Sequence, residues 1–267
     1  IELAAAWIAT LPPQALLGRL ERGLELLEDG ARDAPERQRT MRATVAWSEG
    51  LLAPNERAAF RRLAVFPAGF TLDGSAAILA VTEADALRLV GTLADRHLVR
   101  PLGAPAGEPR FTMLETVRAF ALEGLGANGD AETSRDRLLA WCVDLVERGV
   151  ASVGTVEQGI WLQRVDLELD SMRAALAWGF DRCDPRTLQL AGGLWRYWFT
   201  RGLLSEGRRW GEEALARCAD GTDGDRARVL QGIGALAQAQ GDYDAAEAAL
   251  DRSLRLYRGM GDAAGLA

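Results

Sequence analysis

"HLVRPLGAPAGEPRFTMLETVRAFALEGL", residues 97–125, decides the fold of this chain. Residues 97–102 and 109–114 are short runs rich in β-favouring side chains, and the Gly- and Pro-containing loop between them predicts a hairpin. From Glu115 to Leu125 the apolar residues recur at helical spacing instead. A strand that passes directly into a helix can close a small domain, touch a nucleotide or transmit a movement.

Four helices are predicted before this hairpin. They are expected within residues 40–52, 53–66, 68–80 and 82–99. Thr82 is a candidate N-cap for the last of them, with Asp85 three residues further on. The residues expected to face inward from that helix are Leu87, Val90 and Leu93. Helices, then a hairpin "wing", then a closing helix are the order of a winged-helix domain, which we place at residues 40–125.

The rest of the chain is predicted to be helical. We assign residues 133–181 to linker helices and residues 185–267 to tetratricopeptide-like repeats. Residues 225–258 fit the 34-residue tetratricopeptide pattern of two helices with small residues at their contact. The positions that carry this fit are Ile233, Gly234, Ala237, Ala246 and Leu250, whereas Ser253 replaces the usual last alanine. The predicted fold is therefore mainly α: a winged-helix domain with a small β-hairpin, followed by an α-superhelical repeat array.

Stacked repeats present a concave face that binds other proteins or ligands. The candidates for a partner-binding site on that face are Trp195, Tyr197 and Trp198, from the run "WRYWF". A run this dense must also direct some aromatic rings inward, so packing between helices is the alternative interpretation.

The ends of the sequence suggest a piece of a longer protein. Residues 1–30 are expected to form two helices, and residues 31–39 a polar, Arg-rich linker. Ile1 already lies within a helical pattern, and the last residues resemble the start of another helix.

The composition excludes several kinds of site. All 31 basic residues are Arg, so the chain cannot supply a P-loop, whose pattern requires Lys. The formal net charge of −7 disfavours non-specific binding to nucleic acid, which depends on neutralised phosphates. Three widely spaced cysteines and one histidine, His97, indicate neither a disulfide framework nor a metal site. Because no signal peptide and no membrane-spanning run is visible, we expect a cytoplasmic protein that does not contact a membrane.

No enzyme activity is expected from the residues of this chain, which show no Ser/His/Asp arrangement. The closest approach to paired catalytic carboxylates is "DLELD", with Asp166, Glu168 and Asp170. Residues i and i+2 of a helix face apart, so we interpret this run as a solvated face.

Six segments occur along the chain in this order: "RQRTMRATVAWSEGLL", "FRRLAVFPAGFTLDGS", "LADRHLV", "RFTMLETVRAFALEGL", "DLELDSMRAALAW" and "GLWRYWFTRGLLSEGRRW". In this order and spacing they resemble the middle of bacterial STAND regulators, which are signal-transduction ATPases with numerous domains. That group includes large actinobacterial transcriptional regulators of the LuxR and antibiotic-regulator classes.

The resemblance implies a layout for the parent protein. A P-loop ATPase domain, with ATP or ADP and Mg²⁺ as cofactors, would precede residue 1, and residues 1–30 would be the end of the helical domain that follows it. The winged helix would contact that ATPase domain, and the repeats would bind an unknown protein or small-molecule inducer. ADP would hold the protein closed, and ATP would open it for assembly into an oligomer. DNA would be bound only through an effector domain that this chain lacks.

The resemblance also assigns a role to the strand-to-helix junction. In plant and animal relatives, the closing strand of the winged helix carries a Met-His-Asp motif whose histidine touches the ADP phosphates. Met113 and Glu115 match the outer positions, so Leu114 and Glu115 are the candidate nucleotide-facing residues. Leucine cannot donate a hydrogen bond to phosphate, so a mechanical joint is favoured over a nucleotide sensor.

Three functions therefore remain open. The first is the regulatory and sensor middle region of an ATP-switched transcriptional regulator, which the ordered segments favour. The second is a stand-alone tetratricopeptide scaffold for protein interactions, without a nucleotide switch. The third is direct reading of DNA by the winged helix. Equal numbers of acidic and basic residues within residues 83–100 disfavour the third, because a reading helix carries a basic footprint.

Overall fold

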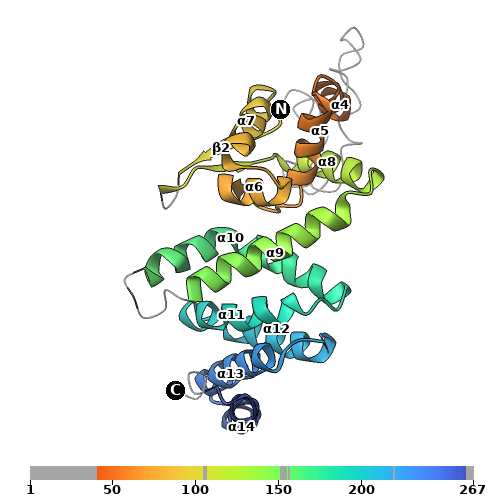
Figure 1. Ribbon diagram of the computed structural model, residues 1–267. Helices are drawn as coiled ribbons and strands as arrows, with labels where there is room; N and C mark the ends of the chain where they lie inside the picture. Colours follow the sequence, from red (N-terminus) through yellow and green to blue (C-terminus); the bar gives the residue numbers. More distant parts are fainter. Residues whose placement is uncertain (1–40, 105–106, 151–154, 156, 219, 263–267) are drawn as a thin grey trace, which may run out of the picture. The chain divides into compact units, whose positions relative to one another are not determined.

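The computed structural model describes residues 41–104, 107–150, 155, 157–218 and 220–262 (Figure 1). It confirms the predicted fold class, because the described residues form helices and one small antiparallel sheet. The chain divides into two compact units after Ser134. The helices predicted for residues 1–30 and the linker at 31–39 lie outside the described residues, and the finer domain boundaries stay predictions.

The first unit has the predicted order of helices, wing and closing helix. Its elements are α4 (Met41–Gly50), α5 (Pro54–Leu63), β1 (Phe70–Thr71), α6 (Leu72–Leu79), α7 (Glu83–Asp95), β2 (Arg100–Gly103), β3 (Arg110–Thr112) and α8 (Glu115–Ala127). The sheet has the order β1-β3-β2, and both strand pairs are antiparallel. The predicted hairpin is therefore the β2–β3 pair, which extends away from α8 (Figure 1).

Strand β1 is the element that the sequence pattern did not predict. It has two residues, too few for the alternation that identifies a strand. Phe70 pairs with Phe111 on β3, and their rings stack with centroids 6.1 Å apart. A contact between residues this far apart in sequence defines the strand, so local periodicity carries no signal for it.

Capping and burial explain the limits of α7. The Thr82 hydroxyl accepts a hydrogen bond of 3.2 Å from the backbone amide of Asp85, which confirms the predicted N-cap. The inward stripe is Ala86, Val90 and Leu93, at helical spacing. The prediction that Leu87 faces inward is wrong: its side chain is 51% exposed, because it lies one residue past the buried stripe.

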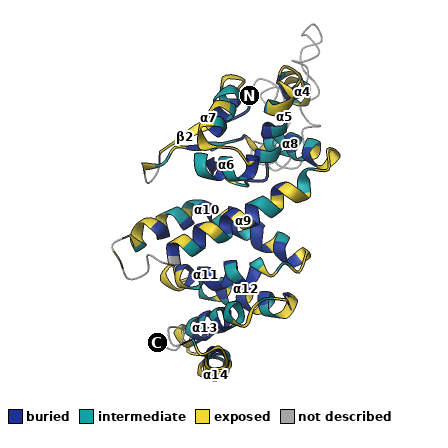
Figure 2. Ribbon diagram, viewed as in Figure 1, coloured by how far each residue is buried: buried dark blue, intermediate teal, exposed yellow. Residues whose placement is uncertain are grey.

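The second unit is a stack of antiparallel helices. Its elements are α9 (Ala131–Val150), α10 (Gln158–Asp181), α11 (Arg186–Thr200), α12 (Leu204–Arg217), α13 (Asp223–Ala239) and α14 (Tyr243–Met260). Within this unit α9 lies beside α10, where Trp178 donates a hydrogen bond to Asp136, and α11 lies beside α12 and α13 beside α14, as successive layers (Figure 1). Buried positions follow the faces that the helices turn toward one another, and exposed positions follow the outer faces (Figure 2).

The contact between α13 and α14 has the predicted repeat geometry. A Cβ added to Gly234 on α13 would lie 2.6 Å from Cγ of Leu250 on α14, so glycine permits this close approach. Ser253, which departs from the repeat pattern, is buried and donates a hydrogen bond of 2.8 Å to the Ala227 carbonyl on α13. The hydroxyl thus has a partner in the core, as a buried polar group requires.

The acidic run on α10 is not a solvated face, and that interpretation is wrong for its central residue. Glu168 is 1% exposed and accepts a hydrogen bond of 3.1 Å from the Ser171 hydroxyl. Asp166 and Asp170 are exposed, as expected for residues that flank it. Glu168 also lies close enough to Cys142 to add to the effect of burial, which raises the pKa of that thiol.

Candidate functional site

The strand-to-helix junction places its two candidate nucleotide-facing residues at the surface. Leu114 is the N-cap residue of α8 and is 46% exposed, whereas Met113 is buried in the core. Glu115 begins the helix and pairs with Arg118 at 3.1 Å. Arg118 also donates a hydrogen bond of 3.1 Å to the Ala64 carbonyl, so the start of α8 is tied to the end of α5. The nucleotide-facing role of Leu114 and Glu115 stays a prediction.

The position of α7 before the wing is that of a reading helix, but its charges do not favour DNA. Arg88 pairs with Asp85 on the same helix. Glu83 and Asp95 are exposed near its two ends, and Arg96 and Arg100 are exposed just beyond. Phosphate contacts require a surplus of basic side chains, which this segment does not have.

Two exposed leucines accompany these charges. Leu87 lies on the outer side of α7, and Leu102 on the wing strand β2 is 47% exposed. Leu87 and Leu102 are candidate contacts for another protein domain, because apolar surface is buried where proteins associate.

The aromatic run on α11 divides between core and surface. Tyr197 and Trp198 are only 2% and 1% exposed, because packing between helices encloses both rings. The prediction that these two residues bind a partner is therefore wrong. Trp195 is half-buried and carries the Arg196 guanidinium 4.4 Å above its ring. Phe199, which the sequence reading missed, is 48% exposed and meets the Trp195 ring edge-on at 6.5 Å. Their spacing of four residues on one helix was the available signal.

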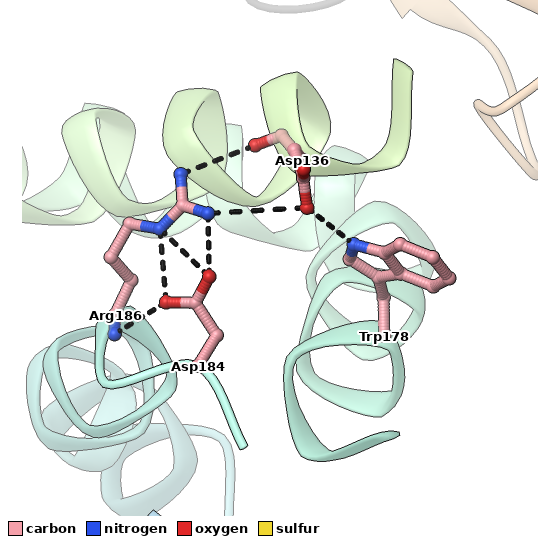
Figure 3. Close-up of polar contacts among 4 residues, drawn as sticks. All are labelled: Asp136, Trp178, Asp184 and Arg186. Atoms are coloured by element: carbon pink, nitrogen blue, oxygen red, sulfur yellow. Dashed lines mark hydrogen bonds and ion pairs between the residues drawn. The ribbon is translucent and has the colours of Figure 1, made fainter. Parts of the chain in front are cut away.

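A polar cluster joins α9, α10 and α11 (Figure 3). The Trp178 indole nitrogen donates a hydrogen bond of 2.8 Å to Asp136, and Arg186 donates to the Asp136 carbonyl at 3.5 Å. Arg186 also contacts Asp184 through its backbone amide at 2.9 Å and through two guanidinium nitrogens. These guanidinium hydrogen bonds lower the pKa of the Asp184 carboxyl. The cluster is a structural clamp between successive helices, since every polar group in it is directed at another helix or at the turn before α11.

The described residues offer neither a metal site nor a membrane span. Among the described residues, no three or more side chains of the types His, Cys, Asp or Glu lie together so that they could hold a metal ion. Within the same residues, no helix combines the length and apolar character needed to cross a membrane.

Comparison with known proteins identifies both parts of the chain. Residues 52–126 match the family described as "Winged helix-turn-helix domain", and residues 199–259 match the family described as "Tetratricopeptide repeat". The first match covers α5 to α8 with the three strands, and the second covers α12 to α14. No solved structure matches the chain.

Similar proteins come from mycobacteria. The chain is 36% identical over 218 residues to "Putative HTH-type transcriptional regulator Rv0890c" of Mycobacterium tuberculosis and to "Putative HTH-type transcriptional regulator Mb0914c" of Mycobacterium bovis. These alignments cover 79% of this chain and 24% of each relative. "Uncharacterized protein Rv0894" of Mycobacterium tuberculosis is 38% identical over 136 residues, which cover 49% of this chain and 34% of that protein.

The chain spans about a quarter of the length of the first two relatives. The family matches and these relatives agree with the two units of the structure. The chain therefore contains a winged helix-turn-helix domain and a tetratricopeptide repeat, and it is similar to proteins named as HTH-type transcriptional regulators.

Proposed function

We propose that this chain is the regulatory and sensor middle region of an ATP-switched transcriptional regulator. The winged helix clamps a nucleotide-binding domain of the same protein, and the repeats receive a protein partner or a small-molecule inducer. The observation that carries the proposal is the surface of α7 and the wing, where exposed Leu87 and Leu102 accompany balanced charges. Such a surface suits contact with another protein domain better than contact with phosphates.

The nucleotide itself is not held by the residues of this chain. A P-loop requires Lys, and all basic residues here are Arg. By the resemblance to STAND regulators, Leu114 stands where plant and animal proteins of that group have a phosphate-contacting histidine, and its side chain offers no hydrogen-bond donor. ATP or ADP and Mg²⁺ therefore belong to a separate ATPase domain in this proposal, and DNA belongs to a separate effector domain. We assign no catalytic role to the chain, and assembly into an oligomer would follow ATP binding.

The repeat unit supplies the sensing surface. The half-buried Trp195, the exposed Phe199 and the Arg196 guanidinium lie together on α11. Aromatic rings and arginine are the side chains enriched where proteins recognise one another. The argument from these three side chains does not depend on nucleotide binding, so partner binding by the repeats can be tested separately from the nucleotide switch.

Two measurements test the proposal. A P-loop should be encoded within about 300 codons upstream of residue 1, since an ATPase domain is of about that size or smaller; its absence would exclude the ATP switch. In the full-length protein, Leu87→Asp with Leu102→Asp should speed release of a fluorescent ADP analogue. Val81→Asp, a charge added at another exposed apolar position of the first unit, is the control. Equal release rates in the wild type, the double variant and the control would contradict contact between the winged helix and the nucleotide-binding domain.

The alternative function is a stand-alone tetratricopeptide scaffold without a nucleotide switch. It requires a start codon close before residue 1 and a stop codon soon after residue 267. Direct reading of DNA is a further alternative, favoured by the match to the winged helix-turn-helix family. A mobility-shift assay with the whole chain at low salt tests it, and no shift at micromolar protein rejects it.

A further inference from the structure

A groove on the second unit has no role in the function proposed so far. Helix α13 packs against both α12 and α14 (Figure 1). The groove is lined by residues of these three helices. Its volume is about 330 Å³, at the lower end of the range of sites that bind small ligands or a few side chains of a peptide. The apolar residues that line it are Leu215, Leu230 and Leu256, one from each helix.

The charged residues that line the groove are mostly basic. They are Asp223, Arg226, Arg252 and Arg255. Arg226 pairs with Asp223 at 3.5 Å, one turn away on α13. Arg252 and Arg255 are exposed on α14, and within the described part of the chain neither has a carboxylate within ion-pair distance.

Several other arginines of this unit pair with carboxylates. Arg208 pairs with Asp242 at 2.8 Å, Arg217 with Glu213 at 3.0 Å, and Arg228 with Glu147. The whole chain has a formal net charge of −7, so carboxylates are abundant. Two guanidinium groups beside a leucine-lined floor therefore form a local positive site on an acidic protein, and a negatively charged ligand complements it.

We propose that this groove binds an acidic segment of a partner protein, in which carboxylates flank one or two apolar side chains. The apolar side chains pack on Leu215, Leu230 and Leu256, and the carboxylates bind Arg252 and Arg255. Arginine suits this task because its planar guanidinium binds a carboxylate through two parallel hydrogen bonds. The apolar floor favours a peptide over a nucleic acid, whose backbone would place phosphates and sugars there.

The inference names the chemistry of the partner and rests on the proposal that the repeats receive a protein. The groove is nevertheless distinct from the aromatic surface of Trp195 and Phe199, because those residues lie on α11 and the groove is lined by α12, α13 and α14. Partner binding at α11 and partner binding in the groove can therefore be separated by mutation.

The test uses the whole 267-residue chain and a library of ten-residue peptides. Apolar positions vary among Leu, Ile, Val, Met and Phe, and the intervening positions are acidic, amide or basic. Retained peptides are labelled with fluorescein and titrated by anisotropy, with a single-stranded oligonucleotide of equal length as a competing class. Arg252→Glu and Arg255→Glu are compared with Arg258→Glu, which makes the same charge change at an exposed position of α14 outside the groove. Circular dichroism checks that each variant is folded.

The expected result is selection of the acidic peptides. Each groove variant should weaken binding by about tenfold, as loss of a charge pair at an interface does, whereas Arg258→Glu changes it by less than about twofold. Equal retention of the amide peptides, equal loss in Arg258→Glu, or preferential binding of the oligonucleotide would overturn the inference. Binding that Trp195→Ala abolishes and Arg252→Glu leaves intact would also overturn it, while partner binding by the repeats would stand.

Discussion

The hydroxyl group of Tyr197 on α11 donates a hydrogen bond of 3.0 Å to Oδ1 of Asp166 on α10. Arg201 binds the same carboxylate through its Nε at 2.9 Å. Burial, and then the hydrogen bond to Asp166, raise the pKa of Tyr197 to about 12. One carboxylate of α10 thus binds Tyr197 on α11 and Arg201 at its C-terminal end, so the Tyr197 ring is held between the two helices.

The raised pKa of Tyr197 predicts a loss of stability at high pH. An unfolded tyrosine ionises near pH 10, whereas the folded one resists ionisation until about pH 12. The stabilising contribution is therefore complete below pH 10 and is lost as the pH rises toward 12. Tyr197→Phe should remove this part of the pH dependence and, by loss of the hydrogen bond, lower the unfolding free energy at pH 7 by about 1 kcal/mol. Urea unfolding followed by circular dichroism from pH 7 to 11 measures both effects.

The matched control for that experiment is Tyr243→Phe, because the Tyr243 ring is exposed on α14. Burial also raises the pKa of Tyr257, so the difference between wild type and each variant is the relevant quantity. An unchanged slope between pH 10 and 11 in Tyr197→Phe would contradict the assignment.

Gly232→Ala should destabilise the second unit. A Cβ at Gly232 on α13 would lie 2.6 Å from Cβ of Trp195 on α11, an atom that cannot move without its backbone. Overpacking of this kind costs about 1–3 kcal/mol, and it outweighs the ~0.5–1 kcal/mol that alanine gains over glycine within a helix. Gly259→Ala on α14 has no neighbour within 4 Å and should be neutral or stabilising. Thermal melting of the two variants decides the matter, and equal melting temperatures would exclude the close approach of α11 and α13.

The sequence predicted most of the fold because local patterns specify most of it. The Thr82 cap, the apolar faces of the helices and the β2–β3 hairpin all depend on residues that are close together in the chain. Strand β1 depends on the pairing of Phe70 with Phe111, which no local pattern records. Leu87 was misplaced because a run of neighbouring apolar residues leaves the phase of the buried stripe ambiguous by one position.

The candidate sites were harder to predict, because burial of a single side chain depends on which helix covers it. Tyr197 and Trp198 lie next to exposed Phe199 in sequence, but α10 and α12 determine which rings are enclosed. Glu168 was placed in solvent by its charge, and the structure buries it with Ser171. The groove over α13 is lined by three helices, so it could not be read from any one segment.

Acid should weaken the polar cluster of Asp136, Trp178, Asp184 and Arg186 that joins α9, α10 and α11. Hydrogen bonds from Arg186 lower the pKa of Asp184 in the folded protein. The stabilisation is therefore complete above the usual aspartate pKa of about 4, and it is lost as the pH falls below that value. Asp184→Asn should lower the unfolding free energy at pH 7 by about 1–2 kcal/mol, in the range for hydrogen bonds to charged groups. The variant should also lose less stability than wild type between pH 4 and 2.

Asp144→Asn is the control for the acid experiment. Asp144 lies on α9 and pairs with Arg148 at 2.8 Å, with both side chains at least half exposed. Exposed pairs contribute about 0–1 kcal/mol, so this variant should follow the wild-type acid profile. The same acid profile in Asp184→Asn would show that the clamp does not couple to pH.

Arg61→Ala should destabilise the first unit more than Arg88→Ala. Arg61 on α5 pairs with the buried Glu49 on α4 at 2.6 Å, whereas Arg88 and Asp85 form an exposed pair within α7. Removal of Arg61 leaves Glu49 without this charge partner, and the expected cost of about 2 kcal/mol lies between those of exposed and fully buried pairs. Arg88→Ala should cost about 0.5 kcal/mol or less. Differential scanning calorimetry of both variants measures the difference, and equal costs would show that the Glu49 pair adds nothing beyond a surface contact.

Leu114→His in the full-length protein tests whether the junction faces a nucleotide. Leu114 is the exposed N-cap residue of α8, so a histidine there can reach outward without disturbing the core. If the position meets ADP, the new imidazole supplies the missing donor to a phosphate, and hydrogen bonds to charged groups are worth about 1.5–3 kcal/mol. ADP release should then slow by about tenfold or more. Val81→His adds the same side chain at another exposed apolar position of the first unit, outside the proposed contact surface, and should leave release unchanged. Unchanged release in Leu114→His would instead make the junction a mechanical joint, in which Arg118 ties α8 to the Ala64 carbonyl at the end of α5.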